Sequence, residues 1–399
     1  MYVARARSEY IKNPEALSEL PDGPNSGYLV IQDGEDSSET SCSGLCLNLR
    51  LKSLPFPQNI KLGLRSDLLI TCDIPQSSLE NIILIPVLNL PLSSKTYYAV
   101  IPNGEYQGQA FTCSRESDMT TCCFWRCFNG SPPKPFDPRN IYQQFQVYEA
   151  SKFSYNCYFR ARSVAPDGII PYFMQRGGWD IWTGFPLEYK LDESASGLNA
   201  SLRARRPDFN FRPSNRTSKA VVVGKWYSPF MFVKDGKVSD QVNRSRYYQV
   251  TLEQKWEQII SSRNHHREGK SVSVDVILDR ETVYVAGNRA DNWDEGNAVE
   301  GAILLRSFGK AEEGREATVV GLSVELVQRI KWEQERGGWE GGKERQVKVE
   351  RTEEFEGDGD WNEFGCFVLV ESFVIRRMDG TVVMTWDFRH TQHIQSIWE

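Results

Sequence analysis

The feature that most constrains the fold is a regular alternation of apolar and polar residues in the last third of the chain. It runs through Ser271–Val276 and Thr282–Val285, and the apolar stretch Cys366–Arg377 follows later in the chain. Successive side chains of a strand point to opposite faces, so this alternation predicts half-buried β-strands. Met378-Asp379-Gly380 joins the last stretch to Thr381–Phe388, which predicts a long hairpin.

Two segments carry a helical pattern instead. Thr251 and Gln254 form a capping box, and the apolar residues that follow share one helical face (Leu252, Trp256, Ile259 and Ile260). A second helix is predicted to start after Ser323 and to stop at the glycines Gly337 and Gly338. Because strands and helices do not alternate regularly, we expect an α+β fold. It would be mostly antiparallel sheet with a few packed helices, and two β-rich halves are one arrangement that this allows.

The length of 399 residues is compatible with two domains. We place the first at 1–215, a β-rich domain that holds the cysteine clusters, and the second at 216–399, an antiparallel α+β domain. In the first, Lys95–Phe111 predicts a hairpin, with a type I′ turn at Asn103-Gly104. The segment Arg203–Arg216 has no period and predicts a loop between the two domains.

Composition narrows the class of partner. The net charge of -6 argues against nucleic acid as the partner. The longest apolar run, Ile82–Leu92, is too short to cross a bilayer, so no transmembrane segment is expected. Without an apolar signal segment at the amino terminus, we expect a cytoplasmic protein, with nuclear or membrane-associated locations as alternatives.

Five of the nine cysteines fall in two short clusters, and they are the candidate metal ligands. A tetrahedral zinc site needs four ligands, and Cys42, Cys46, Cys123 and Cys127 would supply them if the sheet brought the clusters together. The spacing departs from the usual two intervening residues, so buried or exposed thiols are the simpler interpretation. Redox sensing is a further alternative. So is acylation of Cys122, Cys123 or Cys127, which would allow peripheral contact with a membrane.

Histidines and arginines supply the other candidates. His390 and His393, with Asp387 nearby in sequence, are the weak acid–base candidates, and a solvated pair is the plainer interpretation. The arginines Arg203, Arg205 and Arg206 could contact an anion or an acidic partner. The competing interpretation is a loop of salt bridges between domains.

No resident cofactor is predicted, apart from zinc at the cysteine clusters. Gly337–Lys343 matches most of a phosphate-binding loop, but Glu344 replaces the serine or threonine that would hold magnesium. The stretch also follows a helix, whereas that loop must follow a strand. A flexible turn is therefore the better interpretation of these glycines.

Several non-generic motifs spread over nearly the whole chain resemble one family. They include Asn25–Asp33, Leu54–Asn59, Ile85–Ser94, Ile141–Phe145, Ser163–Gly168, Ser201–Phe211, Gly224–Phe232 and Trp386–Thr391. The sequence resembles the plant-specific family catalogued as domain of unknown function 1262. The resemblance implies an intracellular plant protein in a stress or defence setting, and it implies no activity. Ser228 departs from the cysteine associated with the family, which puts a thiol role there in doubt.

From these observations we expect a soluble protein that binds a partner protein or a small ligand. One alternative is a cofactor-free enzyme that uses the histidine and aspartate groups, and whether any reaction is catalysed stays open. Another is a peripheral membrane protein anchored by acylated cysteines. The alternating strand at Ser271–Val276 also fits a pore-forming β-protein.

Overall fold

The structure is a computed structural model of the full chain. It describes these residues: 1–33, 50–68, 76–118, 120–122, 125–127, 131–149, 159–171, 174, 179–265, 269–291, 298–309, 317–342 and 344–399. Among them, 49% lie in strands and 15% in helical segments. The expectation of an α+β fold is therefore wrong, and the chain is mostly β. The helices are too short to form a layer, since α5 (Val324–Arg336) has 13 residues and the other described α-helices have six or seven.

The contacts between residues divide the chain into two compact units, and each unit is made of two pieces of chain. Unit 1 holds Met1–Ser196 and Tyr227–Tyr247, and unit 2 holds Gly197–Trp226 and Tyr248–Glu399. We expected a single boundary after residue 215. That boundary stays a prediction, and the contacts assign one short internal segment to each unit.

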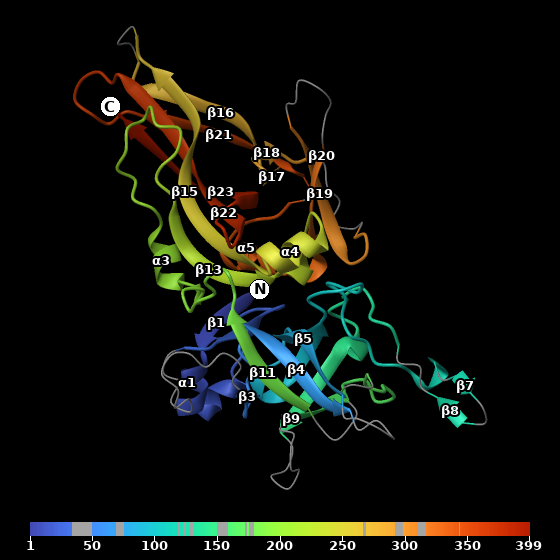
Figure 1. The fold of residues 1–399 in the computed structure, drawn as a ribbon. Helices are drawn as coiled ribbons and strands as arrows, with labels where there is room; N and C mark the ends of the chain where they lie inside the picture. Colours follow the sequence, from blue (N-terminus) through green and yellow to red (C-terminus); the bar gives the residue numbers. More distant parts are fainter. Residues whose placement is uncertain are drawn as a thin grey trace. The chain divides into compact units, whose positions relative to one another are not determined.

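Six strands of unit 1 close into a barrel (Figure 1). Around the barrel they are β4 (Ile60–Leu68), β5 (Gln76–Pro86), β6 (Thr96–Val100), β9 (Gln144–Glu149), β10 (Phe159–Ser163) and β11 (Trp179–Pro186). The ring closes because β10 pairs with β11 as well as with β9. A short seventh strand, β3 (Arg50–Leu51), also pairs with β11. The aromatic rings of Phe56 and Phe159, whose centroids lie 4.9 Å apart, help to fill the interior.

A second group of strands in unit 1 draws residues from both of its pieces of chain. Strand β1 (Tyr2–Ala6) runs parallel to β2 (Gly27–Ile31), and Tyr2 pairs with Tyr227 at the end of β13 (Val221–Pro229). A Cβ at Gly27 would lie 2.8 Å from the Tyr2 ring, so glycine is required for this close approach.

The remaining described elements of unit 1 are short. They are α1 (Arg7–Lys12), η1 (Pro14–Ser18), η3 (Leu92–Ser94), η4 (Glu116–Asp118), β7 (Thr120–Cys122), β8 (Trp125–Cys127), η5 (Ile141–Gln143), η6 (Phe230–Phe232), β14 (Val233–Asp235) and α4 (Val238–Arg244). The expected reversal after β6 is present, with Val100 bridged to Ala110. Its turn is not type I′, because Gly104 has a positive φ and Asn103 does not.

Unit 2 is built on a long antiparallel sheet. Its strands are β18 (Asn288–Arg289), β17 (Glu281–Val285), β23 (Val382–Trp398), β22 (Glu363–Arg377), β15 (Tyr247–Arg263) and β13, with β12 (Gly197–Leu198) paired to β13. Two further pairs are β16 (Ser271–Asp279) with β21 (Gln346–Glu354) and β19 (Ala302–Phe308) with β20 (Ala317–Ser323). The predicted strands and the long hairpin of the last third are thus confirmed.

One of the two predicted helices is confirmed and the other is wrong. Helix α5 begins after Ser323, whose hydroxyl accepts from the backbone N–H of Leu326, and it ends at Gly337. The segment after Thr251 is instead the middle of strand β15. Its buried residues also recur at every second position, and pairing with β22 along most of its length favours the strand.

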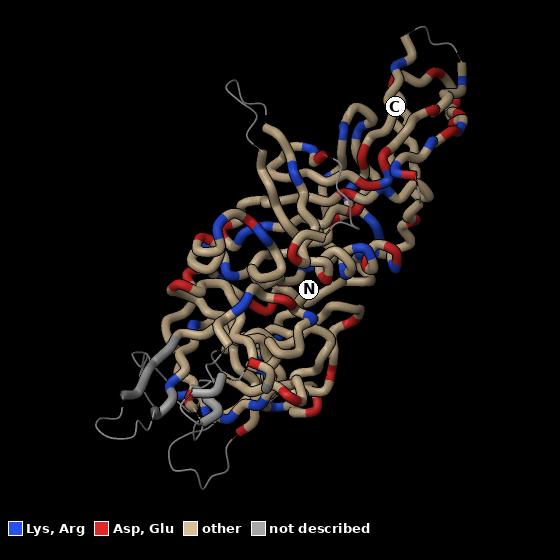
Figure 2. The backbone as a smooth tube through the Cα atoms, turned by 90° about the vertical axis from the view of Figure 1, so that its right-hand side faces the viewer, with Lys and Arg blue, Asp and Glu red and all other residues tan. Residues whose placement is uncertain are grey.

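Figure 2 shows basic and acidic residues interspersed along the backbone, as the small net charge of -6 leads us to expect. None of the helices in the described part of the chain has both the length and the apolar character that crossing a membrane requires.

Candidate functional site

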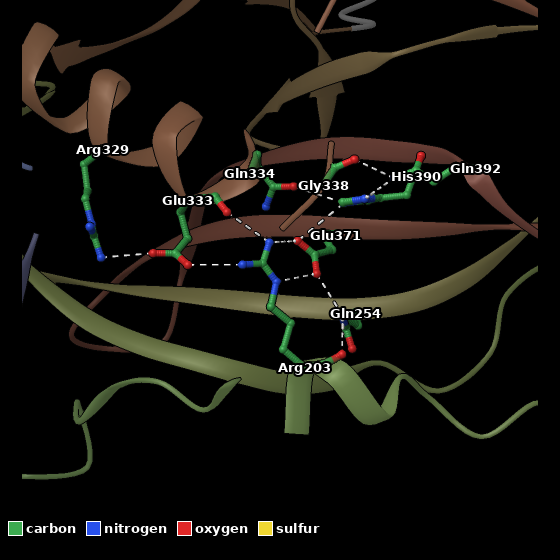
Figure 3. A network of polar contacts seen from close by, with 9 residues as sticks. All are labelled: Arg203, Gln254, Arg329, Glu333, Gln334, Gly338, Glu371, His390 and Gln392. Atoms are coloured by element: carbon green, nitrogen blue, oxygen red, sulfur yellow. Dashed lines mark hydrogen bonds and ion pairs between the residues drawn. The ribbon is translucent and has the colours of Figure 1, made fainter. Parts of the chain in front are cut away.

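The most connected polar cluster of the described chain is centred on Arg203 in unit 2. Arg203 lies in α3 (Ala200–Arg205), a short helix whose first turn is capped by the side chain of Asn199. We call the cluster the Arg203 network. Figure 3 shows its members: Arg203, Gln254, Arg329, Glu333, Gln334, Gly338, Glu371, His390 and Gln392.

Arg203 holds the carboxylate of Glu371 with two parallel hydrogen bonds. Its Nε donates to Oε1 at 2.9 Å and its Nη2 donates to Oε2 at 2.5 Å, and the two side chains are 10% and 2% exposed. This two-point geometry is the strongest that a guanidinium makes with a carboxylate. Strand β22 positions Glu371 within an otherwise apolar stretch.

Helix α5 contributes the other carboxylate. Nη1 of Arg203 donates to Oε1 of Glu333 at 3.1 Å, and Nη2 also reaches the Glu333 carbonyl oxygen at 3.1 Å. Arg329, one turn earlier on α5, donates to Oε2 of Glu333 at 3.0 Å. Two arginines therefore balance two carboxylates, as burial of charge requires.

His390 joins the network from β23. Its Nε2 lies 3.2 Å from Oε1 of Gln334 and 3.4 Å from Oε2 of Glu371. Both oxygens can only accept, so Nε2 carries the proton. Nδ1 then accepts from Nε2 of Gln392 at 3.4 Å, and that amide also donates to the Gly338 carbonyl oxygen at 2.6 Å.

The environment of Glu371 favours its ionised form. Burial alone would raise its pKa, but hydrogen bonds from His390 and Arg203 outweigh burial and lower the pKa to about 2. Gln254 adds a further donor, with its Nε2 at 2.8 Å from Oε1 of Glu371. The carboxylate is thus ionised and fully engaged with groups of its own chain.

Of the other predicted acid–base residues, Asp387 lies apart from this carboxylate, whereas the ring of His393 stacks on that of His390 with centroids 6.3 Å apart. Asp387 accepts from the Ser372 hydroxyl at 2.6 Å, and strand alternation places it on the face of β23 opposite His390. Burial raises the pKa of Asp387. His393 contacts Arg206, with Nε2 3.2 Å from Nη2, and burial followed by the Arg206 charge lowers its pKa.

The three predicted anion contacts separate in the same way. Arg203 is buried in the network and Arg206 faces His393. Arg205 is 73% exposed and lies 3.9 Å from the carboxylate of Asp208. Of these three arginines, the structure places Arg205 and Arg206 at the surface.

The predicted metal ligands fall largely outside the described residues. Cys42, Cys46 and Cys123 are not described, and Cys127 is described only as backbone in β8. In the described part of the chain, no group of three or more histidine, cysteine or acidic residues is arranged to hold a metal ion. The zinc site and the acylated anchor stay predictions.

A pocket of about 510 Å³ lies in unit 1 and was not predicted from the sequence. We call it the Asp33 pocket, and it is lined by Ile31–Asp33, Asn59 and Lys190–Ser194. Asn59 brackets the backbone of Gln32, accepting from its N–H at 2.9 Å and donating to its carbonyl oxygen at 3.0 Å. The side chains of Ile31 and Leu191 are buried and give the pocket an apolar base.

The segment Lys190–Ser194 is held from three directions. The hydroxyl of Tyr227 accepts from the backbone N–H of Asp192 at 3.3 Å. Oδ1 of Asp192 accepts from the N–H of Ser194 at 3.0 Å, and Oδ2 lies 3.3 Å from Nζ of Lys190. The Ala195 carbonyl oxygen accepts from the N–H of Ala4 at 2.8 Å, so this wall of the pocket is fixed to β1.

Sequence reasoning missed Glu371 and Glu333, although each carried a signal. Glu371 interrupts the apolar stretch from Phe367 to Ile375, and Glu333 follows Ile330 on the apolar face of α5. An acidic residue at a core position needs a buried partner, and only arginine or lysine can supply a full charge. The Asp33 pocket had no such signal, because its three pieces are far apart in sequence.

Comparisons with known proteins find a match to one family model over part of the chain. Residues 22–124 match the family described as "Protein of unknown function (DUF1262)", and this range lies within unit 1. No curated protein matches the sequence. Among solved structures, the crystal structure of Cry35Ab1 aligns with 86% of this chain and 90% of its own chain, at 10% sequence identity and a TM-score of 0.45.

Proposed function

We propose that this chain is a non-catalytic binding protein that takes a small molecule in the Asp33 pocket. The observation that carries the proposal is the pocket itself, whose volume of about 510 Å³ falls in the range of small-molecule sites. It combines an apolar base at Ile31 and Leu191 with polar and charged groups at its rim, as ligand sites commonly do.

The Arg203 network supports a binding role over catalysis. A general base must reach the proton that it removes. His390 is 1% exposed, and both of its ring nitrogens are engaged by Gln334, Glu371 and Gln392. Its interactions are those of a structural group that joins β23 to α5.

We further propose a cytoplasmic setting in a plant cell under stress or attack. This setting is supported by the resemblance of the sequence motifs to the plant-specific family. A fluorescent fusion would test the location, and protein abundance before and after a pathogen or osmotic challenge would test the setting. Constant abundance under both challenges would contradict it.

The test of the binding role is a fragment screen by ligand-observed NMR on the full chain, repeated with Glu193→Trp. Glu193 is exposed at the rim, so an indole there should occlude the pocket without disturbing the core. We expect fragments that bind the parent protein to lose most of their signal with this variant. Glu188→Trp, an equally exposed position outside the pocket, is the matched control and should retain the signal.

Hits that bind Glu193→Trp as well as the parent would place the ligand elsewhere and overturn the proposal. A screen without hits for either protein would also count against a small-molecule role, and a partner protein would then be the better hypothesis.

A further inference from the structure

We propose that the ligand of the Asp33 pocket carries a protonated amine, which is held by the carboxylate of Asp33. This inference rests on the proposed binding function and specifies its ligand class. It begins with the charges on the lining. Among the described residues of the lining, three carboxylates (those of Asp33, Asp192 and Glu193) accompany one ammonium, that of Lys190.

The single ammonium is already engaged. Nζ of Lys190 lies 3.3 Å from Oδ2 of Asp192, and the lysine side chain is 84% exposed. Among the described residues, no ion pair involves Asp33 or Glu193. The lining therefore has an excess of negative charge, which favours a cationic ligand over a neutral or anionic one.

The hydrogen bonds of Asp33 also favour a cationic ligand. Oδ2 accepts from the Ser8 hydroxyl at 2.5 Å, whereas the buried Oδ1 has no hydrogen-bond donor. The neighbouring Oε1 of Gln32 is buried and lacks a donor as well. Two adjacent acceptors without partners, one of them on a carboxylate, are unfavourable unless a donor arrives.

An ammonium group matches both acceptors at once. It offers three donors and a positive charge, whereas a hydroxyl offers one donor and no charge. Gln32 and Asp33, the residues that carry these two oxygens, both line the pocket. The apolar base at Ile31 and Leu191 then suits the hydrocarbon body of the same ligand, so we infer an amine with an aromatic or aliphatic body.

The experiment compares three probes of nearly equal shape. Tyramine is a cation, para-ethylphenol lacks the charge, and para-hydroxyphenylpropionate is an anion. Titration of the full chain, followed by NMR, should show tyramine binding at least about tenfold more tightly than para-ethylphenol, because a charged hydrogen bond is involved. The anion should bind most weakly.

Variants identify the group that is responsible. Asp33→Asn keeps an acceptor for Ser8 but removes the charge, so tyramine should lose about tenfold in affinity while para-ethylphenol is unchanged. Glu188→Gln removes an exposed charge outside the pocket and should change neither. Thermal unfolding of each variant controls for folding.

The outcomes separate this inference from the proposed function. Equal binding of the three probes, blocked by Glu193→Trp, would overturn the amine and leave the binding role intact. Binding of none of them at millimolar concentration would overturn the amine, and the fragment screen would then decide the binding role alone. Tyramine binding that Glu193→Trp does not block would contradict both.

Discussion

The Arg203 network of unit 2 and the Asp33 pocket of unit 1 differ in how their carboxylates are paired, although Gln254 in the network also has a buried oxygen without a donor. In the network, the carboxylates of Glu371 and Glu333 receive donors from two arginines, and Glu371 also receives them from His390 and Gln254. In the pocket, Asp33 and Gln32 each retain a buried oxygen without a donor. Satisfied buried charges stabilise a fold, whereas unsatisfied ones beside a cavity indicate a place for a ligand.

The largest expected effect comes from removing the central carboxylate of the network. Glu371→Leu leaves Arg203 buried beside Glu333 alone, so we expect the free energy of unfolding to fall by about 3–5 kcal/mol. Urea denaturation followed by circular dichroism measures it. Glu354→Leu, at an exposed position of β21, should change the stability by less than about 0.5 kcal/mol. Equal effects of the two variants would mean that the network is not a stabilising element.

Acid should weaken the same element. The pKa of Glu371 is about 2 in the folded protein against a usual 4.5, so its contribution is fully present above pH 4.5 and is lost as pH falls through about 2. We expect a loss of about 3 kcal/mol from this group. Glu371→Gln should flatten that part of the stability–pH curve, and Glu354→Gln should not. An unchanged acid limb in Glu371→Gln would contradict the lowered pKa.

A double-mutant cycle sharpens the assignment within the network. Arg203→Met and Glu371→Leu should each destabilise unit 2, but the double variant should be more stable than the sum of the two losses predicts. The coupling energy should be about 1–3 kcal/mol, because removing both charges leaves neither one buried without its partner. Urea denaturation of the four proteins measures it, and simple additivity would show that the pair does not interact energetically.

The smallest expected effect lies in the pocket. Gln32→Leu replaces a side chain whose buried oxygen lacks a donor, so stability should stay constant or rise by at most about 1 kcal/mol. Ligand affinity should fall in the same variant. Gln254→Leu in the network should destabilise, since that amide donates to Glu371 and to the Arg203 carbonyl oxygen. If both glutamine variants destabilised equally, the contrast between the two regions would fail.

Sequence patterns correctly predicted the elements whose ends are set by neighbouring residues. Helix α5 followed from its cap at Ser323 and its stop at Gly337, and the hairpin of β22 and β23 followed from the turn that ends at Gly380. The segment after Thr251 satisfied both a helical and a strand period, and only pairing with β22 decided between them. The closing pair of the barrel, Phe159 with Trp179, is a tertiary contact that no local pattern contains.

The candidate sites followed the same rule. His390 and Arg203 were selected from residue type, but the carboxylate that joins them, Glu371, lies 168 residues from Arg203 in sequence. The Asp33 pocket combines residues near 31, 59 and 192, and none of its residues is chemically unusual alone. Geometry over such separations is set by packing, which the sequence does not display.

The exchange of short segments between the two units determines the order in which a ribosome can complete them. Unit 1 requires Tyr227–Tyr247, so its last elements, β14 and α4, are synthesised only after unit 2 has received its first residues from Gly197 onward. A truncated product that ends at Ser196 would lack Phe232, whose ring packs 5.3 Å from that of Phe136, and the Tyr227 partner of Tyr2. A fragment of unit 1 that ends at Ser196 should therefore retain its native form only when the peptide 227–247 is supplied with it.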